Sequence, residues 1–163
     1  YNVFYAFFLN NFEPILDFSS NVRMENNIDA WNSVNISFTN GVTTSFQSAC
    51  DMTAASSTHD AIIYGTEGFI TTKNFFMAQE AELHKFDSEW GNDNQIVDKI
   101  ELPFLVNGYE YEIIEATDCI LEGRTECKTY PYQYSEILCK TMDALRASWN
   151  FIYPFECQCG KEQ

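Results

Sequence analysis

The sequence predicts an α+β fold, in which a large, mostly antiparallel open β-sheet carries helices on one face. Two observations predict this class. Within residues 29–72, short stretches alternate apolar and polar side chains, which is typical of strands, whereas residues 109–149 carry apolar side chains at helical spacing. Strands that precede helices in the chain favour an α+β fold over alternating strands and helices.

A short helix and then a hairpin are expected in the first third of the chain. The apolar run Val3–Leu9 fits a helix, which cannot continue through Pro14 because proline lacks the backbone donor. Alternation over Asp29–Thr39 predicts a strand. The dipeptide Asn40-Gly41 is typical of a type I′ turn, in which both residues take positive φ. The same alternation over 42–48 predicts the return strand.

Shorter strands are expected in the middle of the chain. Ala61–Tyr64 and Phe69–Thr72 lie on either side of the glycine-containing turn 65–68. Weaker patterns predict strands at Ala81–Phe86 and Lys99–Leu102, which the polar loop 87–95 separates.

The last third predicts two helices. Gly123 is placed to end the first, and Ser135 is placed to cap the second. The apolar residues of the first helix are Tyr109, Ile113, Ala116, Ile120 and Leu121. The apolar stripe of the second consists of Ile137, Leu138, Met142, Leu145 and Trp149.

The composition excludes several classes of partner. Lysine and arginine number 9 against 24 aspartate and glutamate, which gives a net charge of −15. Such a surface repels phosphate backbones and anionic membranes, so neither nucleic acid nor a membrane is expected as a partner. We expect one domain over residues 1–156 with a tail at 157–163. The chain has no initiator methionine, so it is expected to be a piece of something longer.

The cysteines are interpreted as structural thiols of a cytoplasmic protein. There are six: Cys50, Cys119, Cys127, Cys139, Cys157 and Cys159. Cys119 and Cys139 fall among apolar residues of the predicted helices, which suits buried thiols. Cys157-Gln-Cys159 is a tight spacing for a tetrahedral metal site, and no histidine is near it in the sequence. A metal site and a disulfide framework remain as alternatives.

Fingerprints of catalysis and nucleotide binding are absent from the sequence. No G-x-G-x-x-G, P-loop, G-x-S-x-G or H-E-x-x-H occurs. We therefore assign no catalytic, cofactor-binding or metal-binding residue. His59 could pair with Asp60 as a base, or be a surface histidine of a strand. Glu80, Glu82 and Glu89 could include a paired-carboxylate site, but their scatter favours solvated surface. The acidic residues that open the first helix are accounted for by its dipole; they are Glu110, Glu112 and Glu115.

One face of the predicted sheet is polar but uncharged. Ala30–Cys50 spans 21 residues without one charge, in a chain that is 20% charged. Depletion of charge is typical of the buried centre of an interface, which a two-fold axis would turn into a homodimer. The alternative is that serine and threonine simply suit strands.

Aromatic and methionine side chains gather at two places, where they could line an apolar pocket or belong to the core. They are Tyr1, Phe4 and Tyr5 at the start, and Phe75, Phe76 and Met77 after a predicted strand.

Five motifs in order resemble the C-terminal domain of the glucose–fructose oxidoreductase / inositol dehydrogenase / MocA (Gfo/Idh/MocA) family, and most of all its dihydrodiol dehydrogenase-like branch. Ile63–Ile70 is similar to the "GT-G-hydrophobic" turn, and Asn74–Met77 to the stretch after it. The segment from Gly108 to Gly123 resembles the "G-x-x-Y-E" helix. Ser135 with Met142–Arg146 resembles the final helix, and Tyr153-Pro154 its exit.

The resemblance implies a glyceraldehyde-3-phosphate dehydrogenase-like C-terminal domain of an NAD(P)-dependent oxidoreductase that acts on a sugar, polyol or diol. NAD or NADP would bind an N-terminal Rossmann domain, which also holds the catalytic lysine of an E-K-P motif, so this chain alone would not transfer hydride. It implies that Tyr1 and Phe76 or Met77 contact the small-molecule substrate, and that the sheet face makes the dimer. The rivals are a stand-alone carbohydrate- or small-ligand-binding β module that uses Trp31, Trp90 or tyrosines, and a small enzyme built around His59.

Overall fold

The computed structural model describes residues 1–50, 59–86, 94–153 and 156. Its chain forms two compact units. Unit 1 comprises residues 1–53 and 128–163, and unit 2 comprises residues 54–127. The single domain over 1–156 stays a prediction, and the tail 157–163 lies outside the described residues.

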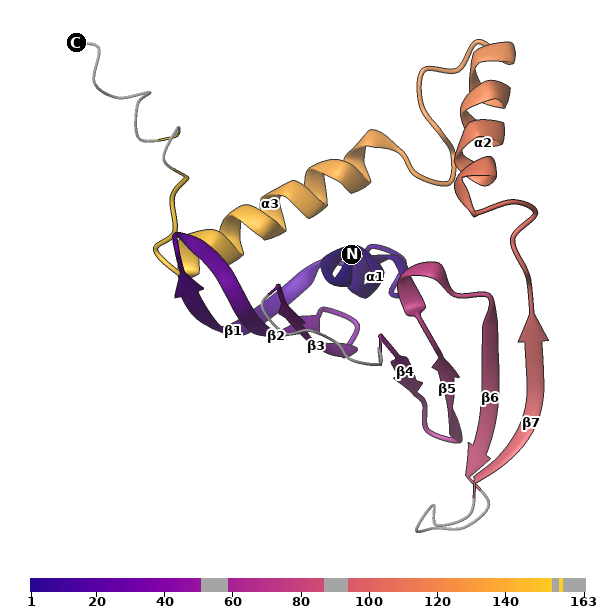
Figure 1. Cartoon of the computed structure of the whole chain (residues 1–163), viewed down its shortest axis with the longest axis horizontal. Coiled ribbons are helices and arrows are strands. Elements are labelled where there is room, and N and C mark those ends of the chain that lie inside the picture. Colours follow the sequence, from indigo (N-terminus) through magenta and orange to yellow (C-terminus); the bar gives the residue numbers. More distant parts are fainter. Residues whose placement is uncertain (51–58, 87–93, 154–155, 157–163) are drawn as a thin grey trace. The chain divides into compact units, whose positions relative to one another are not determined.

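Unit 1 is a three-stranded antiparallel sheet with two helices. The strand order is β1-β2-β3 (Figure 1). The elements are α1 (Asn2–Phe8), β1 (Ile15–Glu25), β2 (Ile28–Phe38), β3 (Thr43–Ala49) and α3 (Tyr132–Ser148).

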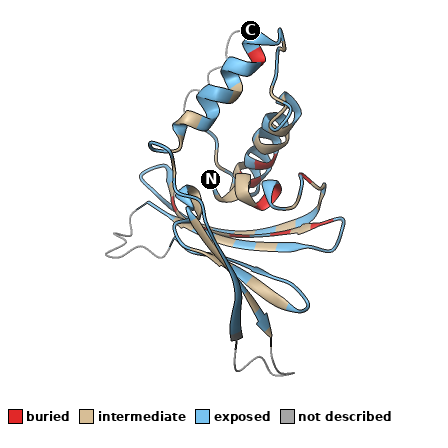
Figure 2. Cartoon of the chain, turned by 90° about the vertical axis from the view of Figure 1, so that its right-hand side faces the viewer, coloured by how far each residue is buried: buried red, intermediate tan, exposed pale blue. Residues whose placement is uncertain are grey.

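The core of unit 1 lies between one face of this sheet and the two helices. Val34, Ile36 and Phe38 point to that face, as the period of two predicted, and all are fully buried. Phe7 of α1 meets Phe38 edge to face at 5.4 Å, and Leu145 of α3 completes the cluster (Figure 2, red). Burying each of these large side chains contributes roughly 1.5–3 kcal/mol.

One hairpin turn of this sheet was not predicted, and the other differs from the prediction. Asn26 and Asn27 join β1 to β2, and both have positive φ, 51° and 60°. At the predicted type I′ turn only Gly41 does, with φ 88°. The N–H of Gly41 donates to the carbonyl of Phe38 (3.0 Å), and that of Phe38 to the carbonyl of Val42 (2.9 Å). The loop is therefore a three-residue one closed by glycine, and the type I′ prediction is wrong.

Unit 2 is a four-stranded antiparallel sheet, in the order β4-β5-β6-β7, followed by a helix. Its elements are β4 (Ala61–Tyr64), β5 (Gly68–Thr72), the 3₁₀ turn η1 (Phe75–Met77), β6 (Glu80–Phe86), β7 (Asn94–Glu101) and α2 (Tyr109–Leu121).

Backbone amides before α2 are satisfied by a side chain within it. The Glu110 carboxylate accepts hydrogen bonds from the N–H groups of Val106 (3.0 Å), Asn107 (3.1 Å) and Gly108 (2.7 Å). Desolvation opposes ionisation of Glu110, but these bonds outweigh it and lower its pKa to about 2. The interpretation of this glutamate as a helix-start residue is supported.

The end of α2 is a Schellman motif, as Gly123 predicted. The N–H of Gly123 (φ 67°) donates to Ile120 O at 3.1 Å, and that of Arg124 to Cys119 O at 2.8 Å. The predicted apolar positions of this helix are nevertheless largely exposed. They are Tyr109, Ile113, Ala116, Ile120 and Leu121.

Helix α3 departs from the expectation at its start and along its stripe. It begins at Tyr132, with the extended Pro131 as N-cap, so Ser135 lies inside the helix and does not cap it. Proline suits a helix start because the first amides have no partner in the helix. Met142 is 46% exposed, and Thr141 instead is buried beside Leu145.

The α+β class with antiparallel open sheets and three α-helices is confirmed, with the strands divided between sheets of three and four. Among the described residues, no helix is both long and apolar enough to cross a membrane.

Candidate functional site

Tyr1, the first predicted pocket residue, is the N-cap of α1 in unit 1 and is 85% exposed. One turn later, the N–H of Tyr5 donates to its carbonyl (2.9 Å). Burial, and to a lesser degree Tyr1, raise the pKa of Tyr5. The Tyr5 phenol can therefore act as a neutral hydrogen-bond donor.

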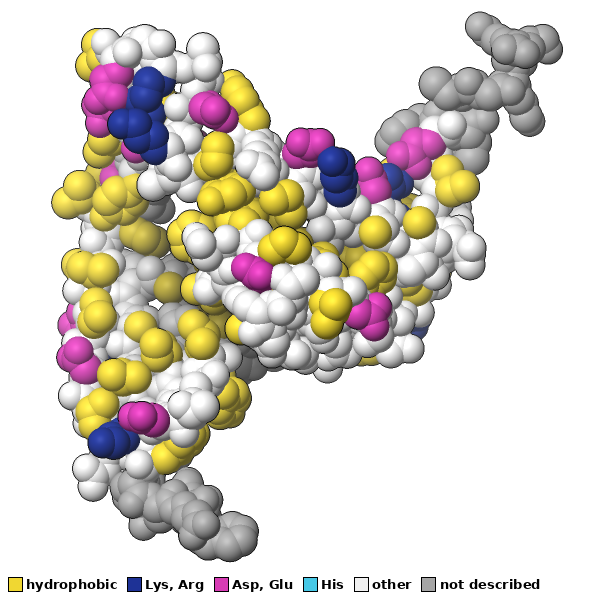
Figure 3. Space-filling view, turned by 180° about the vertical axis from the view of Figure 1, so that it is seen from behind, with side chains coloured by type: hydrophobic (Ala, Val, Ile, Leu, Met, Phe, Trp, Pro, Cys, Tyr) yellow, Lys and Arg dark blue, Asp and Glu magenta, His cyan; other side chains and the backbone are white. Residues whose placement is uncertain are grey.

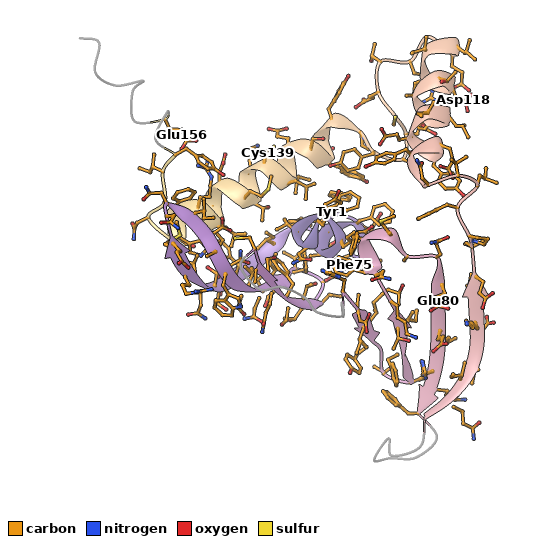
Figure 4. All side chains as sticks on the ribbon, viewed as in Figure 1. Tyr1, Phe75, Glu80, Asp118, Cys139 and Glu156 are labelled. Carbon is orange, nitrogen blue, oxygen red and sulfur yellow. The ribbon has the colours of Figure 1, made fainter. Side chains whose placement is uncertain are left out.

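Phe76 and Met77, the other predicted pocket residues, lie in η1 of unit 2. Asn74 takes a left-handed conformation (φ 48°) and its carbonyl accepts a hydrogen bond from the N–H of Met77 (2.7 Å). The N–H of Phe75 donates to the carbonyl of His59 (2.8 Å), which ties the turn to the residues before β4. Figure 4 labels Phe75 and Glu80 beside this end of the sheet.

The side chains of η1 offer an apolar surface. Met77 is 49% exposed, and Phe76 is half-buried with its ring 5.0 Å from that of His59, edge to face. His59 is thus an exposed residue in contact with an aromatic ring, which favours its reading as a surface histidine. Because Tyr1 belongs to unit 1 and η1 to unit 2, a pocket shared by them stays a prediction.

A ring-lined row on the four-stranded sheet was not foreseen. Tyr64, Phe69 and His84 are cross-strand partners on β4, β5 and β6. The Tyr64 and Phe69 rings are 5.7 Å apart, and Phe69 stacks on His84 at 4.5 Å with only 5° between the planes. The imidazole also lies 3.4 Å from Thr71 Oγ1 and 3.5 Å from a Glu82 carboxylate oxygen.

The same face carries an ion-pair network. Lys99 of β7 lies 3.1 Å from Glu80 and 2.9 Å from Glu101, and 4.0 Å from Glu82. Hydrogen bonds and the charges of Glu101 and Glu80 raise the pKa of Lys99. Glu80 and Glu82, which were expected on solvated surface, lie two apart on β6, are partly exposed and share one lysine. Glu89 lies outside the described residues.

Both carboxylates lie within ion-pair distance of Lys99, an arrangement typical of a surface ion-pair network. The period of two at Glu80, Glu82 and His84 was the signal for this face. Strand register, which brings Lys99 and Phe69 beside them, could not be read from one sequence.

The outer face of β2 and β3 is neutral, as predicted for residues 30–50, but β1 adds exposed Asp17 and Arg23 to the same face, beside Ser37 and Trp31. Facing pairs are Ser33 with Gln47, Asn35 with Ser45, and Ser37 with Thr43. The Ser45 hydroxyl donates to the Asn35 side-chain carbonyl at 2.6 Å. Trp31, at one end of β2, is half-buried, and Trp90 lies outside the described residues.

The described cysteines are free thiols in different settings. Cys119 is buried, as expected, whereas Cys139 on α3 is exposed, so its expected burial is wrong. Cys50 is exposed and Cys127 half-buried. Cys157 and Cys159 lie outside the described residues.

Comparison with known proteins gives the fold but not a family. No family model matches the chain, and no curated protein matches it. Among solved structures, it is similar to a levoglucosan dehydrogenase in complex with NADH and levoglucosan, with 18% identity and a TM-score of 0.52. That match covers 74% of this chain and 39% of the other. It is also similar to an NAD-binding protein from Listeria innocua, with 15% identity and a TM-score of 0.53, over 87% of this chain and 45% of that one.

At these identities the comparison shows that the chain shares its fold with part of each of these two structures. The chain spans less than half the length of either structure that it matches.

Proposed function

We propose that this chain is the substrate-binding and dimer-forming domain of an NAD(P)-dependent oxidoreductase that acts on a sugar, polyol or diol. The observation that supports it is the shared fold with the levoglucosan dehydrogenase structure over 74% of the chain. A Rossmann domain elsewhere in the longer protein would hold the NAD or NADP, since the sequence contains neither nucleotide-binding fingerprint.

In this proposal the chain lines part of the substrate pocket, and the Rossmann domain supplies the cofactor and the catalytic lysine. The nicotinamide exchanges hydride with a hydroxyl-bearing carbon, and a lysine of the Rossmann domain handles the hydroxyl proton. Phe76 and Met77 are the apolar wall, because η1 presents them on a backbone fixed by two hydrogen bonds. Tyr1 contributes a phenol that can hydrogen-bond a sugar hydroxyl.

The partner surfaces follow from exposure and charge. Large apolar side chains of α2, Ile113 and Leu121 among them, are more than half exposed, which supports a covering by another domain. In Figure 3, hydrophobic side chains also appear at the surface over the four-stranded sheet. The neutral part of the outer face, on β2 and β3 around Asn35 and Ser45, would pair with its copy about a two-fold axis, with Asp17 and Arg23 of β1 at its margin.

Two measurements test the division of labour. Calorimetric titration of this chain with NAD⁺ and NADP⁺ is expected to show no binding, and micromolar binding would overturn it. In the full-length protein, NAD⁺ or NADP⁺ is expected to be reduced in the presence of one member of a panel of sugars, polyols and diols. A full-length protein that binds neither nucleotide would contradict the proposal.

A second candidate is a stand-alone carbohydrate-binding module. The ring row Tyr64, Phe69 and His84 favours it, because sugars stack on aromatic faces and Tyr64 is 71% exposed. Titration of this chain with oligosaccharides separates the two candidates. Binding that Tyr64→Ala abolishes and Phe76→Ala leaves unchanged would support the module.

A further inference from the structure

The Schellman motif at the end of α2 places the guanidinium of Arg124 beside the buried thiol of Cys119. Gly123 turns the chain in the left-handed region, and Arg124 then bonds to the last turn through its amide. Its guanidinium Nη1 lies 2.9 Å from Cys119 Sγ and 3.2 Å from the carbonyl of Glu126. Backbone geometry thereby fixes the arginine beside the sulfur.

A second thiol faces the first within this turn. The two Sγ atoms of Cys119 and Cys127 are 3.6 Å apart, so only a small approach separates them from a bond. Cys119 is 6% exposed and Cys127 is half-buried, so a reagent reaches Cys127 first. The Sγ atom of Cys119 also lies 3.8 Å from a Glu115 carboxylate oxygen.

We propose that Cys119 and Cys127 are a reversible thiol–disulfide pair, oxidised by a low-molecular-weight disulfide and reduced by a dithiol. The Cys127 thiolate attacks one sulfur of the small disulfide RSSR, which forms a mixed disulfide and releases RS⁻. Cys119 Sγ then attacks the Cys127 sulfur, loses its proton to solvent and releases the second RS⁻. One RSSR is reduced to two RSH, and the two protein thiols are oxidised to one disulfide.

The order of attack follows from the two environments. Burial above all, and then Cys127, raise the pKa of Cys119, whereas the charge of Arg124 acts in the opposite direction. The raised pKa disfavours the Cys119 thiolate, and burial shields this thiol from the reagent, so the more exposed Cys127 reacts first. Arg124 then stabilises the thiolate that forms next to it.

A metal site at the same place fits less well. The ligand atoms of Glu115, Cys119 and Cys127 lie within 4.8 Å of one another. However, Arg124 Nη1 approaches both Cys119 Sγ (2.9 Å) and the Glu115 carboxylate (3.6 Å), and a guanidinium there repels a cation. Within the part of the chain that the structure describes, the cluster supplies three ligands, one fewer than a structural tetrahedral zinc site takes.

Peptide mapping of the wild-type protein tests the pair without any substitution. Trypsin cleaves after Lys99, Arg124 and Lys128, so Cys119 falls in the peptide 100–124 and Cys127 in 125–128. After incubation with oxidised glutathione and alkylation of free thiols, the two peptides are expected to be joined and to separate on reduction. Two separate peptides that carry glutathione or the alkylating group would overturn the proposal. Stoichiometric Zn²⁺ binding to the reduced protein would also overturn it, if that binding requires both cysteines.

Single variants test the order of attack. Cys119→Ser is expected to trap glutathione on Cys127, whereas Cys127→Ser is expected to leave the buried Cys119 at least roughly tenfold slower to modify. Equal rates in the two variants would overturn the order. Cys139→Ser is the matched control, since this exposed thiol has no role in the pair and the linked peptide should form unchanged. Circular dichroism checks that each variant is folded.

Discussion

The carbonyl oxygen of His84 fills the space beside the Cα of Gly68 in which any other residue would carry its Cβ. Gly68 opens β5 and pairs with Lys85 on β6, so this close approach fixes how the two strands meet. The same contact aligns Phe69 with His84 in the next position of the register.

Gly68→Ala is therefore expected to destabilise the protein by about 1–3 kcal/mol, because backbone atoms and not a flexible side chain would have to move. Gly65→Ala is the matched control, since a Cβ there would meet only the Gly68 carbonyl oxygen, at an ordinary 3.5 Å. Urea unfolding measures both. Equal loss of stability in the two variants would contradict this packing.

The core of unit 1 depends on Phe38, which is fully buried against Phe7. Phe38→Ala is expected to lower the unfolding free energy by about 3–5 kcal/mol, through lost burial and the cavity left behind. Leu16→Ala removes an exposed side chain from β1 and should change the unfolding free energy by less than about 0.5 kcal/mol. Chemical denaturation compares the two, and a mild effect at Phe38 would place the core elsewhere.

Glu110 makes stability depend on pH in the acidic range. Its pKa is about 2 in the folded protein, below its ordinary value of 4.5. Its stabilising effect is therefore complete above pH 4.5 and is lost as the pH falls through about 2. Glu110→Gln should lower the melting temperature at pH 7, by an amount that shrinks below pH 4.5. The control Glu112→Gln, in the same helical turn but outside the three amide bonds, should lack this pH dependence.

The neutral outer face of β2 and β3 predicts a dimer that an added charge would disrupt. Asn35→Glu places a carboxylate in the middle of this face, where it would meet a nearby copy of itself across a two-fold axis. Light scattering is expected to give a dimer for the protein and a monomer for this variant. Thr117→Glu, on the exposed side of α2, should leave the dimer intact. A wild-type monomer at high concentration would remove the proposed interface.

Local patterns predicted the hairpin of β2 and β3 and both long helices. Alternation also identified the buried face of β2, whereas helical spacing did not identify the buried side of α2, whose predicted apolar positions are exposed. Strand β1 was missed, although Asn26 and Asn27 mark a turn after it. Its polar serines and asparagine, such as Ser20 and Asn21, obscure the apolar positions Phe18 and Val22.

Features that depend on register or on chain reversal were beyond the sequence. Lys99 reaches Glu80 and Glu82 only because of the pairing of β6 with β7. Similarly, the contact of Cys127 with Cys119 follows from the turn at Gly123. The sequence indicated where this turn lies, but not the direction that the chain takes after it. The prediction that Ser135 caps α3 was wrong because the helix begins earlier, directly after Pro131.

Steady-state kinetics of the full-length protein tests most directly whether η1 is a substrate wall. Phe76→Ala is expected to raise KM for the sugar, polyol or diol by roughly tenfold, which is about 1.4 kcal/mol of lost binding, and to leave KM for NAD⁺ or NADP⁺ unchanged. Tyr64→Ala, an aromatic truncation elsewhere in unit 2, should change neither. An unchanged KM for the carbon substrate in Phe76→Ala, or a rise confined to the nucleotide, would contradict the proposed role.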